Sequence, residues 1–257
     1  TLTMCVFIIS KGEINMKFID QLKEKAKQNK KTIVLPETSD MRTIEAAGKV
    51  LAEGIANIIL VGDKEDIMSR AGDIDLSGAS FVDPKNYEKF DEYVDAFVEM
   101  RRKKGMTEAR AKELLLTNPL YFGCMMVKQD DADGMVAGAI NASADVLRAA
   151  LQTLKTAPGT RIVSAFFLVV VPDCQYGANG TFVFADAGLY QSPSASELAD
   201  IAEQSAKSFE LLVDETPVVA MLSHSTKGSA KHPDVDKVIE ATEIVNAEFP
   251  DLLCDGE

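Results

Sequence analysis

Apolar positions in the first half of the chain alternate between short uninterrupted runs and helical spacings. Residues 32–35 form a β-branched run that ends at Pro36, as expected for a buried strand. Residues 40–53 place apolar side chains along one helical face and end at Gly54, a usual helix stop. Residues 57–61 are again continuously apolar. This succession predicts a strand–helix–strand unit, and the right-handed crossover rule makes its two strands parallel.

The same pattern recurs up to residue 157. The other elements expected in this part of the chain, two strands and several helices, lie at residues 18–26, 79–82, 87–128, 134–137 and 143–155. Strands that alternate with helices are typical of a parallel sheet covered on both faces. We therefore predict a first αβα domain over residues 16–157.

Beyond residue 158 the pattern becomes richer in strands. The run RIVSAFFLVVV, residues 161–171, has no polar alternation, as expected for a strand buried on both faces. The further strands and helices are predicted at residues 181–185, 194–212, 218–222 and 234–248. We expect a second αβα domain over residues 158–257, incomplete at its end, where DGE is typical of a strand that leads into a loop.

The first fifteen residues carry an apolar patch at residues 4–9 that is too short to cross a bilayer. They have neither the basic start nor the small-residue cleavage site of a secretion signal. Because Met16 opens a helical segment, we interpret residues 1–15 as a non-native leader and leave them out of the fold.

Charge and cysteine content narrow the function classes. The 257 residues carry a net charge of −13, which argues against nucleic acid and anionic membrane surfaces as partners. An anionic ligand must therefore meet a local cluster of Arg, Lys and N–H groups. Four scattered cysteines and two histidines are poor material for a disulfide framework or a metal site. We expect reduced thiols, a cytoplasmic location and no metal.

Two segments of the first domain place polar groups where parallel strands end. LPETSDMR, residues 35–42, brings Glu37, Asp40 and Arg42 to the carboxyl edge of the sheet, where α/β proteins bind ligands. DGMVAGAINASADVLR, residues 133–148, leads through small residues to a helix that we expect Ser143 to cap. Taken alone, each segment is also typical of an ordinary capped helix.

Two arginines and a hydroxyl-rich loop add further anion-binding groups. Arg101 in FVEMRRKKG and Arg148 present planar guanidinium groups that match phosphate and carboxylate. LSHSTKGSAKHPD, residues 222–234, surrounds Lys227 with hydroxyl groups suited to phosphate oxygens. A solvated helix end and a flexible polar loop are the alternative interpretations.

Together and in this order, these segments resemble the phosphate acetyltransferase (phosphotransacetylase) family from residue 16 to residue 257. The stretches that carry the resemblance are long, and include KTIVLPETSDMRTIEAA, ADGMVAGAINASADVLRAALQ, SAFFLVVVPDCQYGANGTFVFADAG and VAMLSHSTKGSAKHPDV. The resemblance implies an α/β fold of two αβα domains, isocitrate/isopropylmalate-dehydrogenase-like, with a cleft between them and with the C-terminal part absent.

The resemblance also implies the activity and the partners. Acetyl transfer between coenzyme A and inorganic phosphate would proceed through a ternary complex, with thiolate attack on acetyl phosphate. The implied protein is a homodimer of acetate metabolism without a cofactor, with acetate kinase as its metabolic partner. A phosphate butyryltransferase and a non-catalytic acetyl-CoA-binding regulatory domain are the alternatives.

By position, the resemblance assigns catalytic roles to Arg101 and Arg148. The residues that it assigns to substrate or coenzyme A binding are Arg42, Ser143, Asp145, Ser225, Lys227, Gly228 and Ser229. The family's base, an Asp in a late Ser-Arg…Asp segment, has no counterpart in this sequence, so we expect little or no turnover by the 257-residue chain. Ala149 stands where the family usually has Pro, and His224 where it usually has an aromatic such as Tyr; we expect both to be tolerated.

Overall fold

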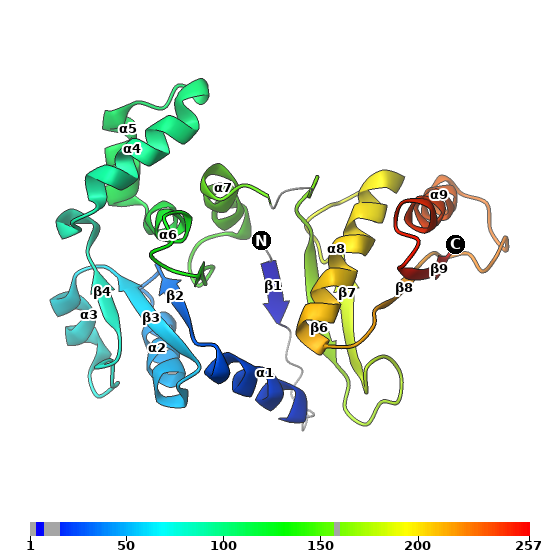
Figure 1. The fold of residues 1–257 in the computed structure, drawn as a ribbon, viewed down its shortest axis with the longest axis horizontal. Coiled ribbons are helices and arrows are strands. Elements are labelled where there is room, and N and C mark those ends of the chain that lie inside the picture. Colours follow the sequence, from blue (N-terminus) through cyan, green and yellow to red (C-terminus); the bar gives the residue numbers. More distant parts are fainter. Residues whose placement is uncertain (1–3, 8–15, 157–159) are drawn as a thin grey trace. The chain divides into compact units, whose positions relative to one another are not determined.

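The computed structural model describes residues 4–7, 16–156 and 160–257. The chain divides into two compact units, Asp20–Lys155 and a second unit made of Thr1–Ile19 with Thr156–Glu257. Each unit combines strands and helices, which confirms the α/β class (Figure 1).

The unit Asp20–Lys155 is built on a four-stranded parallel sheet in the order β4-β3-β2-β5. These strands are β2 (Lys31–Leu35), β3 (Ala56–Val61), β4 (Ser80–Val82) and β5 (Gly134–Met135). The helices of this unit are α1 (Met16–Gln28), α2 (Met41–Glu53), α3 (Lys64–Ala71), α4 (Phe90–Arg101), α5 (Glu108–Thr117), α6 (Pro119–Lys128) and α7 (Ser143–Thr153). The division between the units falls within α1, before Asp20. Short 3₁₀ turns lie at Pro84–Asn86 and Arg102–Lys104.

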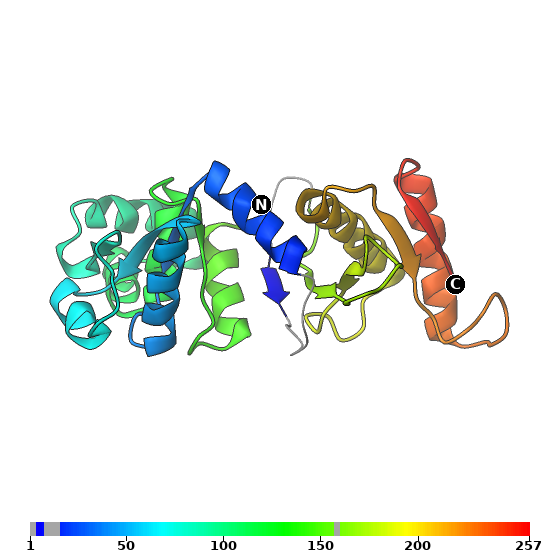
Figure 2. The ribbon, with the colours of Figure 1, turned by 90° about the horizontal axis from the view of Figure 1, so that it is seen from below.

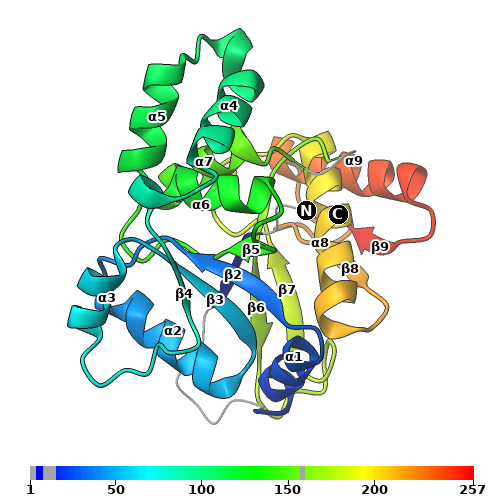
Figure 3. The same cartoon turned by 60° about the vertical axis from the view of Figure 1, so that its left-hand side comes forward.

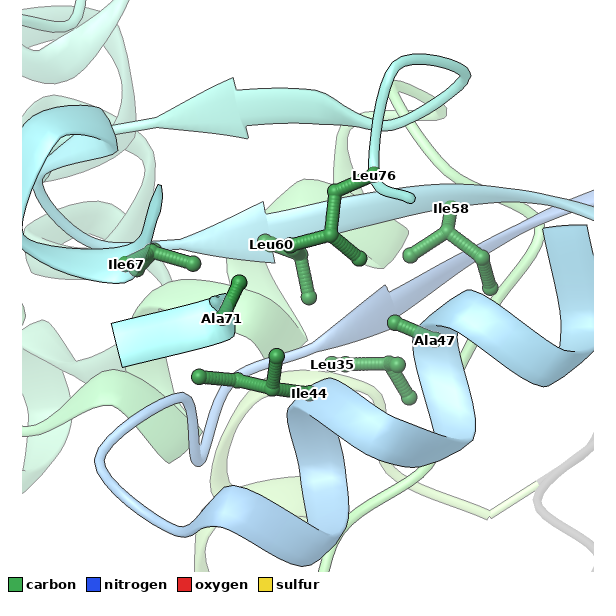
Figure 4. Packing of buried hydrophobic residues seen from close by; sticks show 8 residues of the cluster. All are labelled: Leu35, Ile44, Ala47, Ile58, Leu60, Ile67, Ala71 and Leu76. Atoms are coloured by element: carbon green, nitrogen blue, oxygen red, sulfur yellow. The ribbon is translucent and has the colours of Figure 1, made fainter. Parts of the chain in front are cut away.

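Alternating apolar side chains of this sheet are buried on opposite faces. On one face Leu35, Ile58 and Leu60 pack against Ile44 of α2, and Figure 4 shows α3 and Leu76 closing the same cluster. On the other face α6 approaches β2 so closely that a Cβ built on Gly123 would lie 3.3 Å from Val34 Cγ1. Figure 3 shows α2 and α6 on opposite sides of the strands. The uninterrupted apolar runs of the sequence therefore reflect burial on both faces.

The first crossover helix, α2, has the ends that the sequence predicts. Asp40 is its N-cap and accepts a hydrogen bond from the Arg42 N–H at 2.8 Å. Gly54 ends the helix with φ +68°, a left-handed conformation that glycine adopts without strain. The Asp40 cap fixes where the chain turns after β2, and so places Arg42 in the first turn of α2.

The second unit contains two small sheets. Strands β1 (Met4–Phe7), β6 (Ala165–Val170) and β7 (Thr181–Ala185) form one, and β8 (Val218–Met221) pairs in parallel with β9 (Leu253–Gly256) in the other. Helix α8 (Ala195–Val213) packs against β7, β8 and helix α9 (Pro233–Glu248). In Figure 2, α9 (orange) lies along β9 (red).

Two details of this unit differ from the sequence prediction. Strand β6 begins at Ala165, four residues later than expected, and the side chain of Arg161 before it bonds to Asp200 of α8 (2.5 and 3.0 Å). Residues 4–7, which the sequence analysis left out of the fold, form β1 parallel to β6. Strand β7 runs antiparallel to β6, so this sheet is mixed.

A cavity of about 470 Å³ opens in this second unit, between β7, α8 and β8. Its lining combines apolar side chains with polar groups and contains no residue predicted for the site. Within residues 4–7, 16–156 and 160–257, no helix is long and apolar enough to cross a membrane.

Candidate anion-binding site

The buried carboxylate of Glu37, only 2% exposed, organises the loop that follows β5. It accepts hydrogen bonds from four consecutive backbone N–H groups, those of Gly138, Ala139, Ile140 and Asn141, at 2.6 to 3.2 Å. The side-chain amide of Asn141 adds a fifth hydrogen bond at 2.7 Å. One carboxylate at the end of β2 therefore fixes the path of a loop about a hundred residues away in sequence.

Burial of Glu37 favours the neutral acid, but the hydrogen bonds from the Asn141 side chain and from the loop N–H groups outweigh it. The pKa of Glu37 therefore lies below its ordinary value of 4.5. At neutral pH the group is an ionised anchor, and the hydrogen bonds that it accepts are charge-assisted.

We expect acid to weaken this anchor. Because the folded-state pKa is depressed, the stabilisation is present above the unfolded pKa and is lost as the pH falls through the folded pKa. Between about pH 7 and about pH 3.5, the free energy of unfolding should decrease more in the wild-type protein than in Glu37→Gln, which has no carboxyl group to titrate there. Urea unfolding at both pH values measures the difference, and equal losses in the two proteins would contradict the prediction.

Arg42 lies between this loop and the start of α2. Its guanidinium donates to both carboxylate oxygens of Asp40, at 3.0 and 2.7 Å, and to the carbonyl of Ala139 at 2.5 Å. The side chain is nevertheless 71% exposed, so donors of the guanidinium face solvent. Arg42 is thus placed by the N-cap of one helix and by the loop that leads to another.

Helix α7 starts directly after the anchored loop. The sequence analysis was wrong in expecting Ser143 to cap this helix. Ala142 is the N-cap residue, in extended conformation and without a capping side chain, and Ser143 is the first helical residue. Asp145 in the first turn pairs with Arg148 one turn later, at 2.6 Å. The helix therefore starts one residue earlier than a Ser143 cap would place it.

The charges of Arg101 and Arg148 both act on Tyr121, a residue that the sequence analysis did not select. Tyr121 on α6 is 7% exposed and donates its hydroxyl hydrogen to Gln152 on α7 at 3.1 Å. Burial raises the pKa of Tyr121, while the charges of Arg148 and Arg101 act to lower it. Both guanidinium groups therefore lie within electrostatic reach of one phenol ring. Helices α4, α6 and α7 bring them there from positions 47 residues apart in sequence.

The two arginines differ in their partners. Arg148 is paired with Asp145, whereas the Nε of Arg101 is buried and has no hydrogen-bond partner within the part of the chain that the structure describes. A buried guanidinium N–H without an acceptor is costly, since the group has lost its water.

In the second unit, the loop at residues 222–234 is tied to the end of β9. Lys227 pairs with Asp255 at 2.8 Å, and this hydrogen bond raises the pKa of Lys227. The N–H of Gly228 donates to the carboxylate of Glu257. Lys227 is therefore already ion-paired, with a carboxylate that the sequence analysis did not single out.

The hydroxyl groups of this loop bond mainly to one another and to its backbone. Ser225 and Ser229 lie with their Oγ atoms 3.5 Å apart, and Ser229 accepts from the Thr226 N–H at 2.7 Å. Ser225 is buried and accepts from the N–H of Ala230 at 3.2 Å. The structure thus groups Ser225, Lys227, Gly228 and Ser229 in one compact turn. Their binding role stays a prediction.

The geometry defines a class of protein: an α/β protein whose parallel sheet carries arginines beside the loops that follow its strands, an arrangement suited to phosphate-bearing ligands. A family model described as "Phosphate acetyl/butaryl transferase" matches residues 17–257. The chain belongs to this family.

Individual relatives agree with this assignment. The phosphate acetyltransferase of Acetivibrio thermocellus is 52% identical over 242 residues, which cover 94% of this chain and 73% of the relative. That of Escherichia coli is 40% identical over 239 residues, covering 92% of this chain and 32% of the relative. A solved structure of the EutD phosphotransacetylase from Staphylococcus aureus has a TM-score of 0.85 at 36% identity, with 96% of this chain and 74% of that chain covered.

A second solved structure, a phosphotransacetylase from Streptococcus pyogenes, also has a TM-score of 0.85, at 39% identity over 95% of this chain and 72% of that chain. At these identities the likeness extends beyond the general α/β class. The mixed α/β fold with a parallel sheet is therefore the fold of phosphotransacetylases.

Proposed function

We propose that this protein transfers an acetyl group between coenzyme A and inorganic phosphate. The observation that carries the proposal is that the charges of Arg101 and Arg148 both act on Tyr121, while the buried Nε of Arg101 has no acceptor among the residues that the structure describes. Acetyl phosphate, phosphate and coenzyme A all present phosphoryl oxygens that suit these donors. The family and the names of the relatives support the choice of substrates.

We propose a direct transfer in a ternary complex. The thiol of coenzyme A loses its proton, and the thiolate sulfur forms a bond to the acetyl carbon. The bond between that carbon and the phosphate oxygen breaks, and inorganic phosphate leaves. Arg101 and Arg148 would stabilise the charge that develops on the departing phosphate, while Arg42 would orient the anionic parts of a substrate. We assign no residue of this chain to deprotonation of the thiol.

The finer expectations from the resemblance stay predictions. They are the isocitrate/isopropylmalate-dehydrogenase-like topology, the homodimer, the absence of a cofactor, the cytoplasmic location and the link to acetate kinase. We propose acetyl and not butyryl as the transferred group, because the relatives reported above are named for acetyl transfer or as phosphotransacetylases.

Calorimetric titration of the 257-residue chain tests the proposal without requiring turnover. We expect saturable binding of coenzyme A and of acetyl phosphate, with inorganic phosphate displacing acetyl phosphate. Thioester formation is then followed with acetyl phosphate and butyryl phosphate side by side, and acetyl phosphate should be preferred wherever turnover is detected. A chain that is folded by circular dichroism and binds neither ligand would refute the proposal.

A further inference from the structure

Glu37 is a buried charged residue that the proposed reaction does not use. Within the residues that the structure describes, its five hydrogen-bond donors all belong to residues 138–141, and none of them is a cation. A buried carboxylate destabilises the fold unless hydrogen bonds compensate its desolvation, and here backbone N–H groups and the Asn141 amide supply the compensation. Glu37 therefore places a buried charge where its hydrogen bonds fix the conformation of a single loop.

We propose that Glu37 is a positioning residue for substrate binding, which holds residues 138–141 in the shape that presents Arg42 and the start of α7 to an anionic ligand. The inference rests on the proposed function and adds to it a residue that contacts no substrate. Glu37 acts through the loop, because the loop carbonyl that it fixes, that of Ala139, accepts from the Arg42 guanidinium at 2.5 Å.

Two neighbouring sets of contacts link the loop to Arg42 and to α7. Asp40, three residues after Glu37, holds the other side of the Arg42 guanidinium, so Arg42 is held between the β2 end and the loop. On the far side of the loop, Asn141 is bound to Glu37 by both its backbone and its side chain, and α7 begins two residues later. Release of Glu37 would therefore loosen Arg42 and the first turn of α7 together.

Glu37→Gln is the informative variant. Glutamine keeps the size of the side chain, but its NH₂ group is a donor where the loop offers only donors, so two of the N–H groups lose their acceptor. Glu37→Asp keeps the charge on a shorter side chain that cannot reach the whole loop. It provides a second variant if Glu37→Gln fails to fold.

Asp131→Asn is the matched control. Asp131 is also a carboxylate with little exposure in the same unit, and it accepts from the hydroxyl groups of Tyr93 (2.5 Å) and Tyr87 (3.3 Å) and from Lys89. None of these partners belongs to the loop at residues 138–141. Loss of the Asp131 carboxylate should lower the stability of the unit without changing the conformation of the loop at residues 138–141.

The test combines two measurements on the full chain. Amide hydrogen exchange, read by mass spectrometry, should show protection at residues 138–141 falling about tenfold or more in Glu37→Gln and unchanged in Asp131→Asn. If the binding-competent loop is then populated about one tenth of the time, the affinity for acetyl phosphate should fall about tenfold in the first variant alone. Glu37→Asp should give intermediate values in both measurements.

The outcomes separate the positioning role from a structural one. Faster exchange at the loop with unchanged acetyl phosphate affinity would overturn the proposal, since Glu37 would then serve only the fold. Equal losses of affinity in Glu37→Gln and Asp131→Asn would also overturn it. A wild-type chain that binds neither acetyl phosphate nor coenzyme A would refute the proposed function itself and the positioning role with it.

Discussion

Alanine in place of Arg101 or Arg148 is expected to weaken acetyl phosphate and coenzyme A binding by about 2–4 kcal/mol, the cost of losing one partner of a desolvated charge-assisted contact. The expectation follows from the electrostatic action of both guanidinium groups on Tyr121 and from the Nε of Arg101, which has no hydrogen-bond partner in the described part of the chain. Isothermal titration of each variant measures the loss. Where turnover is detected, transition-state stabilisation should decrease by a similar amount.

Arg102→Ala is the natural control, because it removes the neighbouring arginine of the same sequence pair. Arg102 is 72% exposed and forms an ion pair with Glu99, so its loss should change ligand affinity by less than about 0.5 kcal/mol. Wild-type affinity in both Arg101→Ala and Arg148→Ala would refute the site, and so would an equal loss in Arg102→Ala.

Phe97→Ala is expected to be the most destabilising single change discussed here, at about 3–5 kcal/mol. Phe97 on α4 is fully buried, and its ring packs edge-on against Tyr121 with centroids 5.9 Å apart. Alanine would leave a cavity behind the Tyr121 phenol, on which the charges of both arginines act. We therefore expect a lower urea midpoint together with weaker acetyl phosphate binding.

Leu116→Ala provides the comparison for Phe97→Ala. Leu116 on α5 is 41% exposed, so its truncation removes far less buried surface and should cost less than about 1 kcal/mol. Equal shifts of the urea midpoint in the two variants would contradict the packing argument. A large shift in Phe97→Ala without any loss of affinity would show that the ring supports the fold but not the site.

The sequence predicted the first unit well because its signals are local. The apolar run at residues 57–61 became β3 (Ala56–Val61), and Gly54 ends α2 as expected. The run at residues 161–171 was less informative, since hydrophobicity alone does not show where pairing starts. Strand β6 begins only at Ala165, after a segment whose Arg161 bonds to a distant helix.

The site was predicted less completely because its contacts are long-range. Local patterns indicated Arg42 and Arg148, but no spacing reveals that Glu37 anchors a loop about a hundred residues later or that Tyr121 lies near two arginines. A glutamate within a buried apolar context, at the end of β2, was the available signal for Glu37. The ion pair of Lys227 with Asp255 had no such signal, since exposed charges pair in many ways.

The Glu37 anchor has a consequence for how such a site evolves. Glu37 bonds to the backbone N–H groups of Ala139 and Ile140 and not to their side chains. Gly138, with φ +109°, and Asn141, whose side chain takes part, are the constrained positions. The two residues between them are free to mutate without changing the shape of the loop, and Ile140 is 57% exposed. Selection can therefore vary the chemistry at this loop while the frame that holds it stays the same.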